Sequence, residues 1–451
     1  MSRIFIVAGK RTAFGAFGGA LKGMTATDLA VHATRGALGA GKVPAEIVDT
    51  VVVGNVQQTS PDAAYLARHV ALKNGMPTPV SCLNINRLCG SGFQSCVNVA
   101  HEIRMGEAAV GVAAGTESMS QAPMSVYGHE VRWGTRLGVN AQMQDTLWAG
   151  LTDSHAGCAM GVTAENLASD YGISRADSDA YAVQSQERWA AASAAGVFVD
   201  EILPIELKSR RGVVAFEIDE HPRQTSLEKM GTLPTTFKKG GVVTAASASG
   251  ICDGAGALVL ASEAAVAVHG LTPLCELASW ASVGVDPTRM GIGPVPAIHE
   301  ALHKASMELG QIDRVEINEA FAPQVLITAP RNPSAHVHSS RSILHRAQGA
   351  LVHSARPLAS LSFALRALSP PSHSPRPLVS QVLACAKELG LDQATLNVHG
   401  GAIALGHPLG ASGSRITMHL AHAIARGEVS NAVGAACIGG GQGIALVLKR
   451  A

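Results

Sequence analysis

Residues 88–92 read Leu88-Cys89-Gly90-Ser91-Gly92, and the interpretation of the whole chain starts from them. A short β-like segment, residues 80–86, comes before this stretch, and apolar residues at helical spacing follow it as far as Gly106. Cys89 is therefore predicted to lie in a small loop between a strand end and a helix start. Free backbone N–H groups and the helix dipole at such a place favour a thiolate, the form that attacks carbonyl carbon. The alternative is a buried structural cysteine.

A second copy of this pattern lies near the C-terminus. Leu396-Asn397-Val398-His399 resembles Leu83-Asn84-Ile85-Asn86, and Ser412-Gly413 resembles Ser91-Gly92. Each predicted helix has the same length and is followed by a strand of small residues, 108–114 in the first copy and 431–436 in the second. A duplication of half the chain would place two related sites near a pseudo-twofold axis, so that distant motifs meet in one cleft.

Composition limits the class of protein. The chain has 451 residues, of which 47% are hydrophobic and 15% charged, and this suits two or three α/β domains with sizeable cores. A net charge of +1 gives no electrostatic case for nucleic acid or a membrane surface, and no apolar run approaches the roughly 20 residues that span a bilayer. Eight cysteines without a CxxC pair indicate reduced thiols inside a cell.

The N-terminus gives a weak targeting signal. The first 27 residues carry basic and no acidic side chains, as transit peptides do. Residues 4–8 already have the pattern of a core strand, so we do not expect a cleaved presequence.

Helical and strand patterns alternate along the first part of the chain. Residues 51–53 form a predicted buried strand between the helical segments 27–38 and 65–72, which indicates βαβ units around a sheet. Residues 120–245 are more polar, with one helix predicted over 176–195. We interpret this part as an inserted subdomain that covers a substrate; the alternative is a surface excursion without function.

The sheet pattern returns at residues 254–260, and a second half begins near Thr272. In that half, residues 297–309 are predicted to be a helix and residues 315–317 a strand. The predicted organisation is an α/β fold with a first half of residues 1–119 plus 246–271, a loop domain of residues 120–245, and a second half of residues 272–451.

The second half is interrupted by an unusual segment. Residues 325–381 contain no Asp, Glu or Lys but eleven Ser, seven Pro, six Arg and five His, a bias that favours disorder. Gln324-Val325-Leu326 recurs as Gln381-Val382-Leu383, so that joining Gln324 to Val382 would give one continuous helix. We interpret the segment as an insertion of translated non-coding sequence; the alternative is a lineage-specific binding arm. Its histidines lack regular ligand spacing, so no metal site is predicted.

Three further residues lie in loops beside predicted strands or glycines. His407, in the glycine-rich residues 400–410, can approach a thiol and take its proton; the alternative is a loop histidine bonded to backbone. Cys437 is a second candidate thiol, and the Asn318 side chain can orient a water or an oxyanion, although such asparagines usually cap turns. Two cysteines, a histidine and an amide suit acyl transfer through a thioester. A serine hydrolase is not supported, because no GxSxG motif occurs.

Four blocks of this chain resemble the signature blocks of thiolases. They are Asn86-Arg87-Leu88-Cys89-Gly90-Ser91-Gly92, Asn318-Glu319-Ala320-Phe321-Ala322, Gly406-His407-Pro408 and Cys437-Ile438-Gly439-Gly440-Gly441. The similarity covers nearly the whole chain except residues 325–381. The similarity is strongest to mitochondrial members of the family, on residues 116–123 and 290–296. It implies that the protein is located in the mitochondrial matrix, with the cytoplasm as the alternative.

The resemblance implies a thiolase-like fold of two duplicated half-domains with an inserted loop domain, assembled as a homodimer or homotetramer. It implies that Cys89 attacks 3-ketoacyl-CoA after activation by His407, and that Cys437 passes protons to the acetyl-CoA enolate and from CoA. Two oxyanion sites are implied. One consists of His407 and a water held by Asn318, and the other consists of the backbone amides of Cys89 and Gly439.

The resemblance also implies coenzyme A contacts. Arg223, Thr225 and Phe237 match positions around the CoA nucleotide, and Ser249 matches a pantetheine contact. The family pattern Gly-Asn-Ala-Ser-Gly reads Ala246-Ser247-Ala248-Ser249-Gly250 here. CoA and acyl-CoA are thus expected as substrates, with no tightly bound cofactor.

Two classes of function remain open from the sequence. The first is an active thiolase of fatty-acid β-oxidation, thiolytic or condensing two acetyl-CoA. The second is a catalytically impaired, mis-spliced or mis-annotated thiolase-like product, suggested by residues 325–381. A decarboxylating ketoacyl synthase is a distant third, because it would have a second histidine where Cys437 stands.

Overall fold

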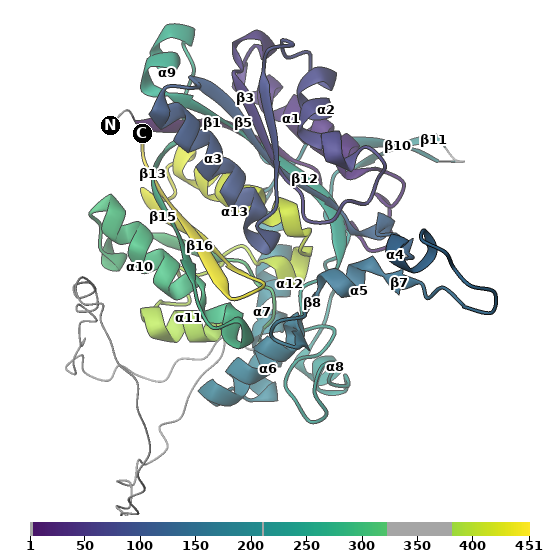
Figure 1. The fold of residues 1–451 in the computed structure, drawn as a ribbon. Helices are drawn as coiled ribbons and strands as arrows, with labels where there is room; N and C mark the ends of the chain where they lie inside the picture. Colours follow the sequence, from purple (N-terminus) through teal and green to yellow (C-terminus); the bar gives the residue numbers. More distant parts are fainter. Residues whose placement is uncertain (1–2, 210–211, 323–380) are drawn as a thin grey trace, which may run out of the picture. The chain divides into compact units, whose positions relative to one another are not determined.

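The computed structural model describes residues 3–209, 212–322 and 381–451. Within them the main element is a ten-stranded sheet whose strands run in the order β14-β15-β16-β13-β1-β12-β5-β3-β4, with β2 paired to β12 (Figure 1). The strands are β1 (Ile4–Arg11), β2 (Gly15–Ala16), β3 (Thr50–Gly54), β4 (Ser81–Ile85), β5 (Val110–Ser118), β12 (Cys252–Ser262), β13 (Cys275–Gly284), β14 (Arg314–Ile317), β15 (Asn431–Ile438) and β16 (Gln442–Lys449).

The sheet consists of two halves in which four strands follow the same order, β1-β12-β5-β3 and β13-β16-β15-β14, and this agrees with the predicted duplication. β3 is parallel to β5 in the first half, as β14 is parallel to β15 in the second, and the remaining central pairs are antiparallel. The halves join through β1 and β13, where Phe5 pairs with Glu276 and Ile6 with Cys275. The predicted strands at residues 4–8, 51–53, 254–260 and 315–317 all lie in this sheet.

Helices cover both faces of each half-sheet. In the first half, α1 (Ala26–Gly41) and α2 (Leu66–Lys73) pack on one face, and α3 (Ser91–Met105) on the other. In the second half, α10 (Pro294–Ala305) and α11 (Gln381–Leu389) cover one face, and α13 (Leu409–Ala425) the other. A further short helix, α9 (Glu263–His269), follows β12.

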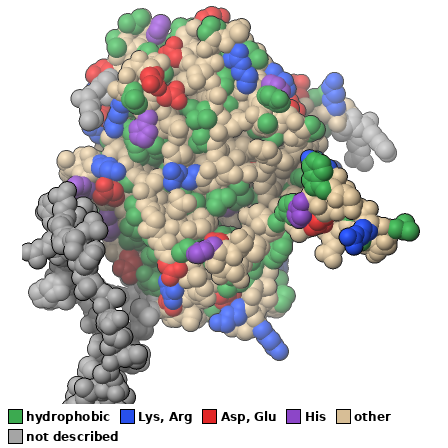
Figure 2. Space-filling model, in the orientation of Figure 1, with side chains coloured by type: hydrophobic (Ala, Val, Ile, Leu, Met, Phe, Trp, Pro, Cys, Tyr) green, Lys and Arg blue, Asp and Glu red, His purple; other side chains and the backbone are tan. Residues whose placement is uncertain are grey.

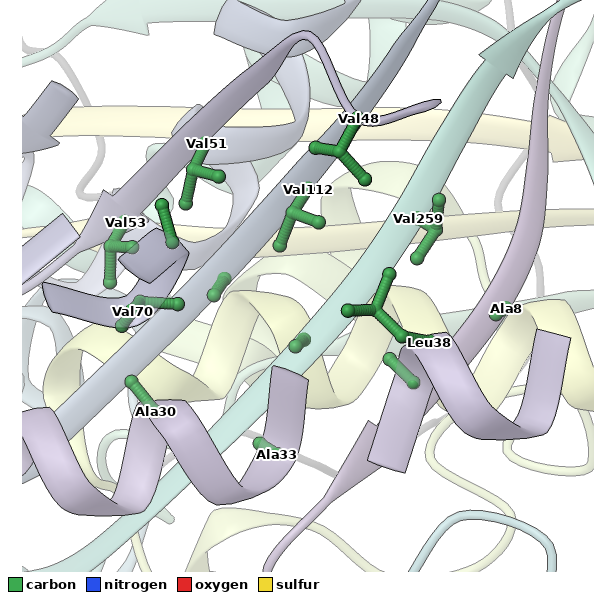
Figure 3. Packing of buried hydrophobic residues seen from close by; sticks show 14 of the residues in the cluster. Ala8, Ala30, Ala33, Leu38, Val48, Val51, Val53, Val70, Val112 and Val259 are labelled. Atoms are coloured by element: carbon green, nitrogen blue, oxygen red, sulfur yellow. The ribbon is translucent and has the colours of Figure 1, made fainter. Parts of the chain in front are cut away.

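Alternation along the strands explains why both faces are apolar. Val51 and Val53 of β3 point to the cluster that α1 forms with the sheet, together with Val112 and Val259 from neighbouring strands (Figure 3). Val52 points the other way, into the cluster around α3 and α13. Successive side chains of a strand face opposite sides, so a strand that is buried on both faces needs a continuous apolar run.

The two central helices, α3 and α13, cross at equivalent glycines of the two repeats. A Cβ on Gly92 would lie 2.4 Å from the Ser414 nitrogen, and one on Gly413 would lie 2.3 Å from the Phe93 nitrogen. Backbone therefore packs against backbone at this crossing, and it brings the first turns of both helices together. These are the turns beside Cys89 and His407.

Residues 120–245 form hairpins and helices outside the main sheet. The longest helix, α7 (Arg175–Ala194), matches the predicted helix and starts with a capping box between Ser174 and Asp177. The other elements are β6 (Met124–Ser125), α4 (Gly128–Val131), β7 (Gln144–Asp145), α5 (Thr146–Gly150), β8 (Thr152–Asp153), β9 (Cys158–Ala159), α6 (Met160–Tyr171), β10 (Ile205–Ser209), β11 (Gly212–Phe216) and α8 (Leu227–Gly231).

Two local predictions need correction. The helix predicted over 297–309 ends at Ala305, because Ser306 takes a left-handed conformation with φ 55° and stops it. Residues 396–399, the counterpart of β4, contribute one isolated bridge from Leu396 to Val315. Asn397 has φ 46°, and its side chain bonds both backbone groups of Ile317, so the chain turns away from the sheet there.

Residues 323–380, which contain most of the predicted insertion, lie outside the described part of the chain. Beyond them the predicted helix does resume, as α11, whose Cys385, Ala386 and Leu389 belong to the core of the second half. Among the described residues, no helix has the length and apolar character needed to cross a membrane.

Candidate active site

Cys89 lies in the tight turn that the sequence predicted. The turn is a 3₁₀-helix, Leu88–Gly90, in which Leu88 has φ 47°. The Leu88 N–H donates to Asn86 Oδ1 (2.9 Å), and the Ser91 hydroxyl donates to the Leu88 carbonyl (2.7 Å). A Cβ on Gly90 would lie 2.6 Å from the Ile438 side chain, so the turn fits closely against β15.

Burial outweighs the features of the turn that favour a thiolate at Cys89. Burial raises the pKa of the Cys89 thiol to about 11, although the backbone N–H groups of Gly439 and of Cys89 itself lower it in part. The sulfur packs in an apolar cluster with Met119, Leu147 and Leu409, where a charge is poorly solvated. Cys89 is therefore a neutral thiol at physiological pH, and a base must take its proton.

His407 can act as that base. It lies in the short turn between α12 (Ala402–Leu405) and α13 and is 5% exposed, and its backbone N–H donates to the Gly250 carbonyl (2.9 Å). Burial, with a contribution from the Arg415 charge, lowers the pKa of His407 to about 4. The imidazole is thus neutral near pH 7 and has a free electron pair to accept a proton.

The ring contacts of His407 indicate which nitrogen carries the proton. Nε2 lies 3.3 Å from the Asn318 side-chain nitrogen, which is a donor, so we assign Nε2 as the unprotonated nitrogen, and the Cys89 thiol would have to replace that contact. The ring proton is then on Nδ1, which faces the Ser412 hydroxyl, while Ser412 itself donates to the Pro408 carbonyl (3.1 Å). The ring is held by side chains, not by backbone alone as the alternative reading of the sequence had it. Sequence reasoning assigned no role to Ser412.

Asn318 directly follows β14 and is 1% exposed. Its backbone N–H donates to the Ala435 carbonyl (2.9 Å). Its side-chain Oδ1 is buried and has no hydrogen-bond partner among the described residues. A buried acceptor without a donor is costly, so this oxygen is suited to a water or a substrate group.

Cys437 is the next-to-last residue of β15 and is 1% exposed. It packs with Met290 and Ala320, and burial raises the pKa of its thiol, with a further contribution from the neighbouring Cys89 sulfur. The turn that follows reaches β16 through Gly440 and Gly441, which have φ 76° and 79°. The structure therefore brings Cys89, His407, Asn318 and Cys437 together from four separate segments.

A cavity of about 430 Å³ opens onto Cys89 and His407. Three of the predicted CoA contacts, Arg223, Phe237 and Ser249, line it, and the rest of its wall is largely apolar: Phe17, Met119, Trp148, Leu151, Met160, Ile251, Met290, Phe321 and Leu409. Thr225 does not line this cavity. It lies in a second one of about 490 Å³, which also includes Arg223.

The altered segment, residues 246–250, still reaches the site. Ala248 forms an antiparallel bridge with Phe321, and the Ser249 N–H donates to the Ala320 carbonyl (3.0 Å). Ser247 is fully buried, and its Oγ accepts from the Thr244 N–H (2.8 Å), so it closes its own turn. Ser247, which departs from the expected family pattern, thus lies in a packed turn, and Ser249 remains in the cavity wall.

Comparison with known families decides the classification. Residues 4–264 match the thiolase N-terminal domain, and residues 271–336 and 377–450 match the thiolase C-terminal domain. The chain belongs to the thiolase family.

Individual thiolases are similar over the full length. The mouse protein named mitochondrial 3-ketoacyl-CoA thiolase is 50% identical over 447 residues, covering 99% of this chain and 98% of that protein, and the human one is 49% identical with the same coverage. The crystal structure of the human mitochondrial enzyme superimposes with a TM-score of 0.86 at 48% identity, covering 100% of this chain and 99% of that one. Its complex with CoA gives 0.84, covering 100% and 98%.

Proposed function

We propose that this thiolase cleaves 3-ketoacyl-CoA with CoA to acetyl-CoA and a shortened acyl-CoA, in fatty-acid β-oxidation. In the reverse direction it condenses two acetyl-CoA to acetoacetyl-CoA. The observation that carries the proposal is the convergence of four side chains. Cys89 and His407 line one apolar cavity, Asn318 contacts His407, and Cys437 neighbours Cys89. Relatives named 3-ketoacyl-CoA thiolase, one of them solved with CoA, support the substrate class.

The first half-reaction transfers the acyl group to the enzyme. His407 Nε2 takes the Cys89 proton, and the sulfur attacks the ketone carbon of the substrate. The bond between the α and β carbons breaks, and Cys437 gives its proton to the departing acetyl-CoA enolate. The acyl group remains on Cys89 as a thioester, and Cys437 is left as a thiolate.

The second half-reaction returns the enzyme to its starting state. The Cys437 thiolate takes the proton of an incoming CoA thiol, and the CoA sulfur attacks the thioester. The tetrahedral intermediate then expels the Cys89 sulfur, which recovers its proton from His407. Acyl-CoA leaves, and Cys89, His407 and Cys437 are again in their starting protonation states.

Oxyanions form in both half-reactions and need donors. We assign one to His407 with a water held at Asn318 Oδ1, which is free to accept, and the other to the N–H groups of Cys89 and Gly439. A preorganised donor of this kind contributes on the order of 3 kcal/mol to the transition state. CoA would be held by Arg223, Thr225, Phe237 and Ser249. Arg223 and Thr225 line the second cavity, so part of the CoA molecule would lie there.

The proposed organisation keeps residues 1–119 plus 246–271 and residues 272–451 as the two halves, with residues 120–245 as the domain over CoA. Self-association as a dimer or tetramer is supported by the segment around α4 and β7, which carries apolar side chains at the surface (Figure 2). Those more than half exposed include Met124, Trp133, Leu137, Val139, Met143 and Trp148. The relatives named mitochondrial support the mitochondrial matrix as location.

An assay of the full chain with acetoacetyl-CoA and CoA tests the proposed function. Acetyl-CoA should form at a rate that depends on both substrates. Absence of acetyl-CoA formation by folded protein would contradict the proposal and favour the impaired product. The geometry does not favour that alternative, because the described residues on both sides of segment 323–380 already assemble the site.

A further inference from the structure

The position of His407 depends on the two helices beside it. α12 ends at Leu405, α13 begins at Leu409, and Ser412, which holds the imidazole, is in the first turn of α13. Neither helix has a side-chain hydrogen bond from its own N-cap, Gly401 or Pro408. The first N–H groups of both helices therefore need acceptors from elsewhere in the chain.

Glu117 supplies the acceptor for α13. It is fully buried at the end of β5, in the opposite half of the molecule, and its Oε2 accepts from the Gly410 N–H (2.9 Å) and the Val56 N–H (3.2 Å). Its Oε1 accepts from Asn55 Nδ2 (3.0 Å) and the Gln57 N–H (2.9 Å). All four contacts are donors, so they favour the carboxylate form and oppose the rise in the Glu117 pKa that burial causes.

The Glu117 contacts also reach the wall beside the nucleophile. Val56 donates its backbone N–H to Glu117, and its side chain packs in the same apolar cluster as Cys89 and Leu409. One carboxylate thus ties the helix that carries Ser412 to the loop that packs at Cys89. Loss of that link would let the two sides of the reacting pair move separately.

Glu319 supplies the acceptor for α12. It directly follows Asn318, is fully buried, and its Oε2 accepts from the Ile403 N–H (3.1 Å) and the Ser185 hydroxyl (2.7 Å). Its Oε1 accepts from the Tyr181 hydroxyl (2.6 Å) and Asn397 Nδ2 (3.0 Å). Ser185 and Tyr181 belong to α7, so this carboxylate fastens the helix before His407 to residues 120–245.

The backbone leaves room for both carboxylates. A Cβ on Gly410 would lie 3.2 Å from Glu117 Oε2 and 2.4 Å from the Thr116 carbonyl, and a Cβ on Gly401 would lie 2.4 Å from Glu319 Cδ. Each carboxylate therefore stands directly against the helix start. Both oxygens of each one accept, so an amide of the same shape would place an NH₂ group against other donors.

We propose that Glu117 and Glu319 are positioning residues that hold the His407 turn from its two sides and so set the distance between Nε2 and Cys89. The inference rests on the proposed function, in which His407 takes the Cys89 proton. A displacement of the turn by about 1 Å would slow acylation by as much as about 100-fold without changing the groups that bind CoA.

The variants Glu117→Gln and Glu319→Gln test this, with Glu276→Gln as a matched control. Glu276 is 6% exposed and pairs with Arg3 and Lys449, so its loss removes a largely buried carboxylate that contacts neither helix start. We expect kcat for acetoacetyl-CoA thiolysis to fall about 10- to 100-fold in the first two variants, with the KM for CoA within about twofold of wild type. The control should keep kcat within about twofold.

Circular dichroism and thermal unfolding show whether each variant is folded at the assay temperature. If either glutamine variant does not fold, Asn55→Ala and Tyr181→Phe each remove one donor and leave the carboxylate in place, and we expect kcat to fall about three- to tenfold. Folded variants with wild-type kcat would overturn the proposal. So would variants whose kcat is unchanged and whose KM for CoA rises about 10- to 100-fold instead. An inactive wild-type protein would overturn the proposed function instead.

Discussion

At the scale of single residues, the chemistry of the site depends on two neutral groups. The pKa of the Cys89 thiol is raised to about 11 and that of His407 is lowered to about 4, so the resting pair is thiol and imidazole at neutral pH. Transfer of the proton between them is uphill in the free enzyme. The charge that forms must be stabilised when substrate is bound, which is the role given to the oxyanion donors.

Cys89 should be the residue that carries the acyl group. Incubation with acyl-CoA, followed by digestion and mass spectrometry, is expected to find the acyl thioester on the peptide that contains Cys89. Cys89→Ala should give no labelled peptide and no turnover. Label on Cys437 with Cys89 unmodified would contradict the assignment.

Cys437 should move protons without carrying the acyl group. We expect Cys437→Ser to become acylated at Cys89 and to turn over at least about 100-fold more slowly, because a hydroxyl is a much weaker acid than a thiol. Acylation is measured by mass spectrometry and turnover by acetyl-CoA release. Near-normal turnover of this variant would mean that another group is the acid and base.

At the scale of elements, the described helices and strands account for the site without residues 325–381. α11 contributes Cys385, Ala386 and Leu389 to the cluster that also contains Leu302 and Val315. On the other side, the Ala322 N–H donates to the Ser247 carbonyl (2.6 Å), so the segment that carries Asn318 is held before the described residues stop.

Deletion of residues 325–381, with Gln324 joined to Val382, should give a protein at least as stable and as active as the full chain. The deletion restores the unbroken helical run that the sequence predicts and shortens the connection between Gln324 and Val382, and the entropy cost of closing a connection rises with its length. Thermal unfolding and acetoacetyl-CoA thiolysis of both chains test this. A longer deletion, of residues 325–389, is the control and should be destabilised, because it also removes the core residues of α11. Loss of both stability and activity in the shorter deletion would show that the segment is a structural part of the protein.

At the scale of the whole molecule, buried titrating groups make stability depend on pH. The pKa of His407 and of His399 is lowered to about 4 by burial, with the Arg415 charge acting on the first and the neighbouring His419 on the second. The unfolded chain, with histidine pKa values near 6.5, binds more protons between about pH 4 and 6.5, so these groups stabilise the fold at neutral pH and less as pH falls.

Glu117 acts in the opposite direction. Burial raises its pKa to about 7 despite its N–H donors, and the Asp253 charge adds to the shift. The folded protein therefore binds more protons at Glu117 than the unfolded chain between about pH 4.5 and 7, and this part of the stability is lost as pH rises through about 7.

The gain in melting temperature between pH 4.5 and 7 should therefore be larger in Glu117→Gln than in wild type. The difference corresponds to on the order of 3 kcal/mol of unfolding free energy across that range. Thermal unfolding at constant ionic strength measures it, with Glu276→Gln as the control for loss of a carboxylate. Equal gains in Glu117→Gln and wild type would mean that Glu117 titrates as an ordinary carboxylate.

The sequence by itself determined the elements and the candidate groups. The strand–turn–helix around Cys89, the core strand at residues 4–8 and the helix at 176–195 depend on hydrophobic period and glycine placement, which are local properties of the chain. The four signature blocks indicated the candidate residues because they resemble those of thiolases.

Only the tertiary structure decided how these groups behave. The neutral state of Cys89 follows from Met119, Leu147 and Leu409 around its sulfur, and these residues come from three distant segments. The placement of Thr225 in a separate cavity and the end of α10 at Ser306 likewise depend on packing. Burial and long-range hydrogen bonds, such as that from Gly410 to Glu117, arise only when the two halves are folded together, because the contacting residues are far apart along the chain.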